Sequence, residues 1–151
     1  MEKNNTKYST STKQVQLYKV HTFRHAESKW NSYARNCHNK LNEDPHKKML
    51  TDRYNPKDTS TDPDLTQAGI KQAKAASKKL LDLLPTLDVI LLSPMSRTHS
   101  TLYYCLKELL DSKAITIDQI PPIKCCPWVM PAIKGFMDLP IMYKKSRDMF
   151  K

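Results

Sequence analysis

The stretch RHAESKWN, residues 24–31, joins a predicted strand to a predicted helix. We expect the strand over Val15–Phe23 (VQLYKVHTF), which is rich in Val, Tyr and Thr and partly alternates polar with apolar residues. Ser28 has the side chain of an N-cap, and the helix is expected to run from there to about Cys37. Backbone N–H groups at a helix N-terminus favour an anion, so this junction is a candidate anion site.

The chain beyond this junction predicts two longer helices and two more strands. One helix covers residues 66–84, with an apolar stripe on one side and lysines that are expected to face solvent on the other. The second covers residues 96–110. We expect a fully apolar, buried strand over Leu87–Leu92 and a weaker one over Ile115–Ile117. This order predicts an α/β fold, in which ligands bind beyond the carboxyl ends of the strands.

A length of 151 residues corresponds to one domain. We expect residues 1–14 to be a disordered tail and residues 15–151 to form the domain. Residues 38–61 contain two prolines, several Asn and Asp and little periodicity, which predicts a long loop. The pattern after Pro121 is also irregular.

The chain is strongly basic, with a formal net charge of +10 and a pI near 9.5, and the basic excess is concentrated in the N-terminal third. Such a charge favours phosphate-bearing ligands, nucleic acid or a membrane surface as partners. Nucleic acid is disfavoured, because the basic side chains are mainly lysines and the aromatic residues form no repeat. Gly69 and Gly135 form no glycine-rich motif, which excludes Walker-type and Rossmann-type phosphate loops.

Cysteine spacing and hydropathy bear on metal binding and location. Cys37, Cys105, Cys125 and Cys126 lack metal-ligand spacing and are expected to be reduced and mostly buried. The longest aliphatic run, residues 89–92, is strand-sized, so no membrane span is expected. Residues 1–14 lack the apolar core of a secretory signal. We expect a cytoplasmic protein, with mitochondria as the alternative because residues 1–14 are rich in Lys, Ser and Thr and nearly free of acidic residues.

A second polar stretch, SPMSRT at residues 93–98, follows the predicted 87–92 strand. If this strand neighbours the first, about 4.8 Å away, Arg24 and Arg97 can hold one phosphate between them. A neutral His25 beside that phosphate is a potential nucleophile, and Ser28 and Asn31 can face the same anion from the first helical turn. The alternative is structural: Arg97 pairs with a carboxylate and His25 is an ordinary, partly buried histidine.

Three stretches resemble the histidine phosphatase superfamily in its phosphoglycerate-mutase-like branch. They are RHAESKWN at residues 24–31, DLT at 64–66 with Gly69, Gln72 and Ala73 after it, and SPMSRT at 93–98. The resemblance covers about residues 15–110, with three motifs in the family's order. Ala26 stands where glycine is commoner in the family.

The resemblance implies a three-layer α/β/α fold and chemistry through a phosphohistidine, without a metal or an organic cofactor. It makes His25 the nucleophile and Arg24 and Arg97 the phosphate-binding arginines. Ser28 and Asn31 match positions that contact the substrate phosphate in that branch. The expected activity is hydrolysis of a phosphomonoester, on a phosphorylated small molecule or a phosphoprotein.

Two family features have no counterpart. No histidine follows His99, which we expect on a helix surface, so the second family histidine is missing. Lys134 and Gly135 stand where the resemblance implies an Arg-Glu pair whose glutamate is the general acid, and Asp138 could substitute for it only if the loop brings it inward. We therefore expect a sheet that is incomplete at its C-terminal end, in a truncated or degenerate chain. The alternative function is a catalytically impaired pseudophosphatase that binds phosphorylated ligands or serves as an interaction module.

Overall fold

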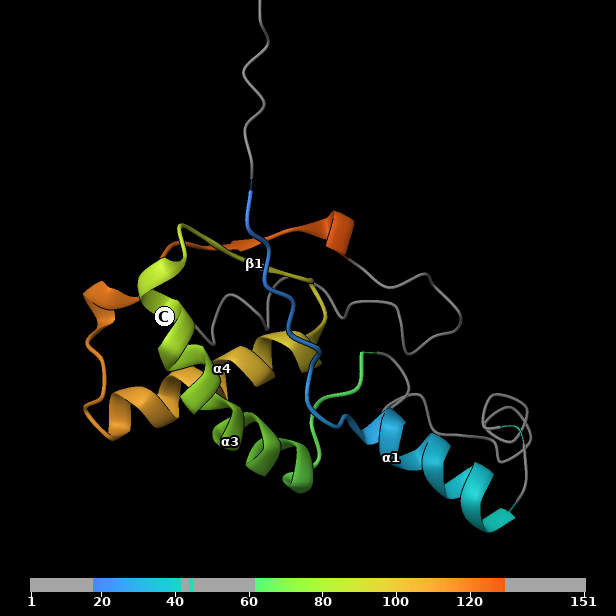
Figure 1. Cartoon of the computed structure of the whole chain (residues 1–151). Helices are drawn as coiled ribbons and strands as arrows, with labels where there is room; N and C mark the ends of the chain where they lie inside the picture. Colours follow the sequence, from blue (N-terminus) through green and yellow to red (C-terminus); the bar gives the residue numbers. More distant parts are fainter. Residues whose placement is uncertain (1–17, 42–43, 45–61, 130–151) are drawn as a thin grey trace, which may run out of the picture.

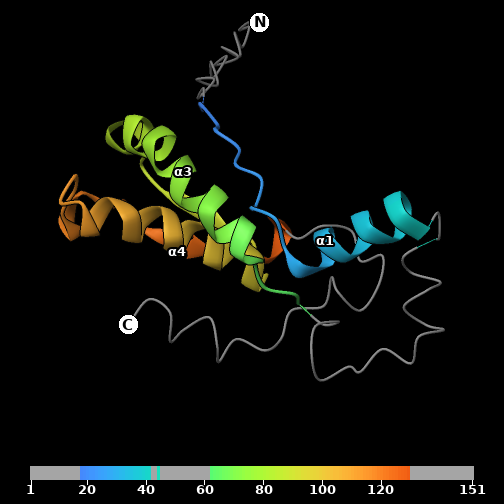
Figure 2. The same ribbon diagram turned by 90° about the horizontal axis from the view of Figure 1, so that it is seen from below.

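The computed structural model describes residues 18–41, 44 and 62–129, which form helices and a small parallel sheet. The three α-helices are α1 (Lys29–Asn36), α3 (Gln67–Leu83) and α4 (Ser96–Asp111), and the strands are β1 (Ile90–Leu92) and β2 (Ile123–Cys125). Short turns of helix cover Cys37–Leu41, Leu84–Thr86, Ile117–Gln119 and Pro127–Val129. In Figure 1, α3 and α4 lie together below the strands and α1 projects away from them; Figure 2 shows the same arrangement from below.

The N-cap of α1 is the one that the sequence predicts, and α3 begins where its helix is expected. Ser28 caps α1, and the Thr66 hydroxyl accepts a hydrogen bond from the Gly69 N–H at 2.9 Å at the start of α3. Pro85 lies in the 3₁₀ turn that follows α3, where the loss of an N–H ends the α-helix. The lysines of α3 are exposed as expected, and one of them, Lys74, pairs with Glu108 of α4 at 3.0 Å.

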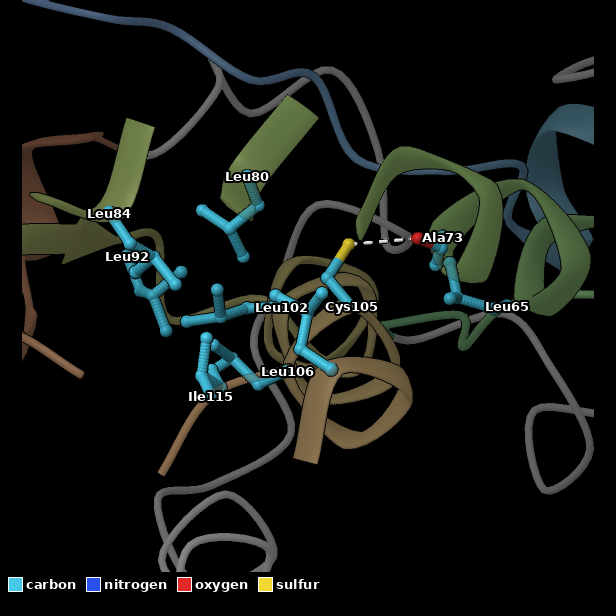
Figure 3. Packing of buried hydrophobic residues seen from close by; sticks show 10 residues of the cluster. Leu65, Ala73, Leu80, Leu84, Leu92, Leu102, Cys105, Leu106 and Ile115 are labelled. Atoms are coloured by element: carbon cyan, nitrogen blue, oxygen red, sulfur yellow. Dashed lines mark hydrogen bonds between the residues drawn. The ribbon is translucent and has the colours of Figure 1, made fainter. Parts of the chain in front are cut away.

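The core lies mainly between α3 and α4, as Figure 3 shows from close by. Its buried members are Leu65, Ala73, Leu80, Leu84, Leu92, Leu102, Cys105, Leu106, Leu109 and Ile115. The Cys105 thiol donates to the Ala73 carbonyl at 2.9 Å, and burial raises the pKa of this thiol to about 11. This contact joins the N-terminal half of α3 to a point just past the middle of α4, and Ala73 permits it because its side chain is a single methyl group.

The sheet differs from the prediction in three places. The strand expected over Val15–Phe23 is wrong where the structure describes it: residues 18–23 pair with neither β1 nor β2, and Tyr18 is 76% exposed. The strand expected over Leu87–Leu92 shortens to β1, and Leu91 is 53% exposed, so the strand is not fully buried. A strand needs a paired neighbour and a covering layer, and neither is visible in local composition.

The third strand lies later than predicted. Ile115 is buried in the core, and Ile117–Gln119 forms a 3₁₀ turn in which Thr116 and Gln119 cap each other. The chain then returns as β2, parallel to β1, with Ile90 opposite Ile123 and Leu92 opposite Cys125. Part of the segment that was expected to be irregular is thus a strand. The unit β1–α4–β2 is a parallel crossover, consistent with the predicted α/β class.

Other predicted segments lie largely or wholly outside the described residues. These are the tail at 1–14 and the loop at 38–61, of which the structure describes only residues 38–41, in the π-helical turn after α1, and residue 44. Within the described part of the chain, no helix combines the length and the apolar character that crossing a bilayer requires.

Candidate functional site

The loop of residues 24–28 is fixed to both long helices. On the α4 side, the Ala26 N–H donates to the Thr101 hydroxyl at 3.0 Å, and that hydroxyl donates to the Arg97 carbonyl at 2.7 Å. One threonine therefore links the residue after His25 directly to the turn of α4 that carries Arg97.

On the α3 side, Glu27 is the anchor. Its N–H donates to Gln72 Oε1 at 2.9 Å, and its carbonyl accepts the Thr66 N–H at 3.0 Å. The next residue, Ser28, forms an isolated antiparallel bridge with Leu65, supported by a 2.8 Å hydrogen bond from the Lys29 N–H to the Asp64 carbonyl. The backbone of the loop is thus held at three consecutive residues, Ala26, Glu27 and Ser28.

Gly69 allows this close approach. A Cβ on Gly69 would lie 2.1 Å from the Glu27 carbonyl oxygen, far inside van der Waals contact. Any side chain at position 69 would therefore push the loop and α3 apart.

The tautomer of His25 follows from its hydrogen bond. Its Nδ1 lies 2.7 Å from the Ala26 carbonyl oxygen, which can only accept, so Nδ1 carries the proton. The lone pair of the neutral ring is then on Nε2. Burial is the main cause that lowers the pKa of His25; the charges of Arg97 and then Arg24 lower it further, against the opposing effect of the Ala26 hydrogen bond. His25 is therefore a neutral imidazole at pH 7.

Both predicted arginines lie close enough to His25 for their guanidinium charges to lower its pKa. Arg97 is buried in the first turn of α4, whereas Arg24 is exposed. The pairing of neighbouring strands that was expected to bring Arg24 and Arg97 together is absent, because residues 18–23 form no strand beside β1. The Ala26–Thr101–Arg97 hydrogen bonds make the connection instead.

Ser28 and Asn31 form a capping box. The Ser28 hydroxyl accepts from the Asn31 N–H at 3.2 Å and donates to Asn31 Oδ1 at 3.0 Å, while the Ser28 N–H donates to the same oxygen at 3.1 Å. Ser28 is 1% exposed. Contact of these two residues with a phosphate stays a prediction, and Asn31 would make it with its NH₂ group, since its oxygen is used in the box.

Glu27 is a carboxylate near His25 that the sequence did not single out as a site residue. Its Oε1 accepts from the Thr66 hydroxyl at 2.7 Å and its Oε2 pairs with Arg35 at 2.5 Å. These two contacts, the Thr66 hydrogen bond first, lower the pKa of Glu27. Glu27 is therefore ionised at neutral pH and serves as an anchor rather than as a proton donor.

His99 is a correction to the sequence prediction. It is 5% exposed, not on the helix surface. Burial lowers its pKa most, opposed by a hydrogen bond with the Ser93 backbone and by the charge of Asp62. The physical reason is that this end of α4 lies inside the protein, where its neighbours Arg97 and Ser100 are buried as well.

The described cysteines are free thiols: Cys37 and Cys105 are buried, Cys125 is exposed and Cys126 is intermediate. Within the described ranges, no cluster of three or more His, Cys, Asp or Glu side chains could hold a metal ion. Lys134, Gly135 and Asp138 lie outside the described residues.

Comparison with known proteins gives one match. The family model of the histidine phosphatase superfamily, branch 1, matches residues 20–120, more than half of the chain. The matched range contains the loop at 24–28 and the first turns of α3 and α4. No curated protein and no solved structure matches the chain.

Proposed function

Because the chain belongs to the histidine phosphatase superfamily, branch 1, we propose that it binds phosphate esters at His25 and accepts their phosphoryl group on Nε2. The observation that carries this proposal is the state of His25: a neutral ring with its proton on Nδ1, within electrostatic range of two guanidinium groups. A nucleophilic histidine needs a free lone pair beside a bound phosphoryl group.

The proposed step is an in-line displacement at phosphorus. The Nε2 lone pair forms a P–N bond while the P–O bond to the leaving group breaks, and the leaving oxygen takes the bonding electrons and then a proton. The Nδ1–H bond to Ala26 keeps the ring oriented and stabilises the positive charge that the imidazole gains. Water then cleaves the P–N bond, which releases phosphate and restores the neutral ring.

The arginines have different tasks in this scheme. Arg97 is buried and fixed to a helix, so it offers a pre-positioned charge for the phosphoryl oxygens. Arg24 is exposed and can adjust to the substrate. Phosphoryl transfer depends mainly on such alignment and charge stabilisation, and phosphate oxygens accept both N–H groups of a guanidinium fork.

A second candidate is binding without efficient turnover, as in a pseudophosphatase or a phosphate-dependent interaction module. It is favoured by the commitment of Glu27 to Thr66 and Arg35, because this carboxylate cannot protonate a leaving group while it is ionised and paired. General-acid assistance is typically worth about 10²–10⁴ in rate. Without it, phosphoryl transfer to His25 would be slow for alkyl esters and faster for esters with acidic leaving groups.

We also propose that the domain has the three-layer α/β/α sheet of the family. The support is the exposed apolar side of β1, where Leu91 is 53% exposed, because a further helical layer would cover such a face. The substrate we propose is a phosphorylated small molecule or a phosphoprotein, in keeping with the two arginines and the basic chain.

The test is trapping of the phosphohistidine. The full chain is incubated with ³²P-labelled phosphomonoester that has an acidic phenol as leaving group, then quenched in alkali, and the label is tested for lability in acid. We expect acid-labile label on the wild-type protein and none on His25→Ala.

His21→Ala is the matched control, since His21 is an exposed histidine of the same segment. It should keep the label. A ³²P-labelled protein that continuously releases phosphate supports the hydrolase. A protein that becomes labelled, or binds phosphate, without releasing phosphate supports the second candidate. Absence of both label and phosphate binding in folded protein would reject the site at His25.

A further inference from the structure

Asp62 binds the first residue of α4 from outside the helix. Its Oδ1 accepts the Ser96 N–H at 2.8 Å and its Oδ2 accepts the Ser96 hydroxyl at 2.6 Å. Asp62 lies 34 positions earlier in the chain, just before the segment that leads into α3, and is 5% exposed. A buried carboxylate thus satisfies an N-terminal N–H of the helix.

This contact replaces a cap that α4 lacks. The N-cap position is Met95, whose side chain makes no capping hydrogen bond and is buried. Helix N-termini need an acceptor for their first N–H groups and are stabilised by negative charge. Asp62 provides both, although it belongs to another segment.

The backbone at Asp62 is held in an uncommon conformation. Its φ is +50°, in the left-handed region that favours glycine and that Asp and Asn tolerate better than other residues. The conformation costs free energy, so the contacts of the carboxylate have to maintain it. The buried Asp62 also acts on His99, one turn further along α4, whose pKa its charge raises against the effect of burial.

Arg97 directly follows Ser96, so the position of its backbone depends on the turn that Asp62 holds. We propose that Asp62 is a positioning residue, whose buried carboxylate fixes the first turn of α4 and thereby aims Arg97 at the phosphate site beside His25. This inference rests on the proposed function for the identity of the ligand. It does not depend on turnover, because a fixed Arg97 is needed for binding alone.

The experiment is titration of the full chain with inorganic phosphate. Asp62→Ala is expected to weaken phosphate affinity about tenfold, the order expected when a misplaced Arg97 loses one charged hydrogen bond to the ligand. Asp62→Asn keeps an oxygen for the Ser96 N–H and tolerates the left-handed backbone, so it should weaken affinity less and should fold even where the alanine variant does not.

A double-mutant cycle separates positioning from general loss of structure. In an Arg97→Ala background, Asp62→Ala should change phosphate affinity by less than about twofold, because the two residues act through one contact. Ile115→Val, which trims the core far along the chain from the start of α4, is the matched control and should leave affinity unchanged. A tenfold effect of Asp62→Ala that persists without Arg97, or none in its presence, would overturn the proposal.

A second readout tests Asp62 even if wild-type protein binds no phosphate, the outcome that would reject the proposed function. The Arg97 Nε–H resonance in ¹H–¹⁵N spectra should be sharp and slow to exchange with solvent in the wild type and in Ile115→Val. It should broaden or disappear in both Asp62 variants, more in Asp62→Ala. An Arg97 signal unchanged by both variants would overturn the positioning role.

Discussion

Replacing Gly69 with alanine tests the contact that holds the candidate loop against α3. The new Cβ would lie 2.1 Å from the Glu27 carbonyl oxygen and 3.0 Å from its carbon, and ordinary contact begins near 3.4 Å. The helix and the loop must therefore separate by about 1 Å. The atom in the way is backbone, held by the Thr66 N–H, so it cannot turn aside as a flexible side chain would.

The magnitude is the balance of two effects. Overpacking of this kind costs about 1–3 kcal/mol, whereas alanine in a helix gains up to about 1 kcal/mol over glycine. We expect Gly69→Ala to lower the free energy of unfolding by about 1–2 kcal/mol, because the clash exceeds the gain. The displaced Glu27 carries Ala26 and His25 with it, and a shift of about 1 Å at a reacting group can cost up to about 10² in rate. Labelling of His25 should therefore slow by at least about tenfold.

The assay is urea unfolding together with the rate of ³²P labelling. Ala75→Gly, on the exposed side of the same helix, is the matched control: it should lose about 1 kcal/mol through helix propensity and keep the wild-type labelling rate. If Gly69→Ala is as stable as the wild type or more so, Gly69 is an ordinary helix glycine and the close approach to Glu27 is refuted. If it labels no more slowly than Ala75→Gly, the loop does not control His25.

Two further predictions concern the same site. Thr101→Val keeps the shape of the side chain but leaves the Ala26 N–H without its acceptor. We expect the free energy of unfolding in urea to fall by about 1–3 kcal/mol and phosphate binding to weaken. Unchanged values for both would contradict the link between the loop and α4. Burial lowers the pKa of both His25 and His99 from 6.5. As the pH falls below 6.5, the unfolded chain therefore binds more protons than the native protein. The stability that these histidines contribute above pH 6.5 is lost as the pH falls towards their lowered pKa values. The urea midpoint should therefore fall between pH 7 and pH 5, less steeply in His99→Gln, and a flat wild-type profile would show that neither histidine is buried in the neutral form.

The helices could be predicted because their signals are local. Ser28 is a cap residue before a helical pattern, and an apolar stripe predicts the helix at 66–84; in the structure Ser28 and Thr66 both act as N-caps. The strands were harder to predict than the helices, because β1 and β2 have three residues each, too few to show alternation. The apolar residues at 115–117 indicated a strand, but Ile115 is buried as part of the helical core instead.

The sequence indicates the candidate residues but not the contacts that hold them in place. Arg24, His25 and Arg97 follow from polar stretches at the starts of helices, and the structure brings them together. The Asp62–Ser96, Glu27–Thr66 and Ala26–Thr101 hydrogen bonds join residues 34 or more positions apart, and no pattern in one segment reports its partner in another. For Gly69 a signal existed, because a glycine in the first turn of a strong helix, in a chain with only two, suggests a close backbone approach.

The packing of α3 against α4 sets the geometry at His25. On α3, Gly69 lies one turn before Ala73; on α4, Thr101 lies one turn before Cys105, whose thiol bonds the Ala73 carbonyl. Gly69 and Thr101, which contact the loop, therefore each lie one turn N-terminal to the Cys105–Ala73 contact, and the distance between them depends on how closely the helices pack there. Small residues permit that contact, since Ala73 is 1% exposed with only a methyl group between the helices. A larger side chain at position 73 would therefore move Gly69 and Thr101 apart and strain the loop that carries His25, which is held to both helices.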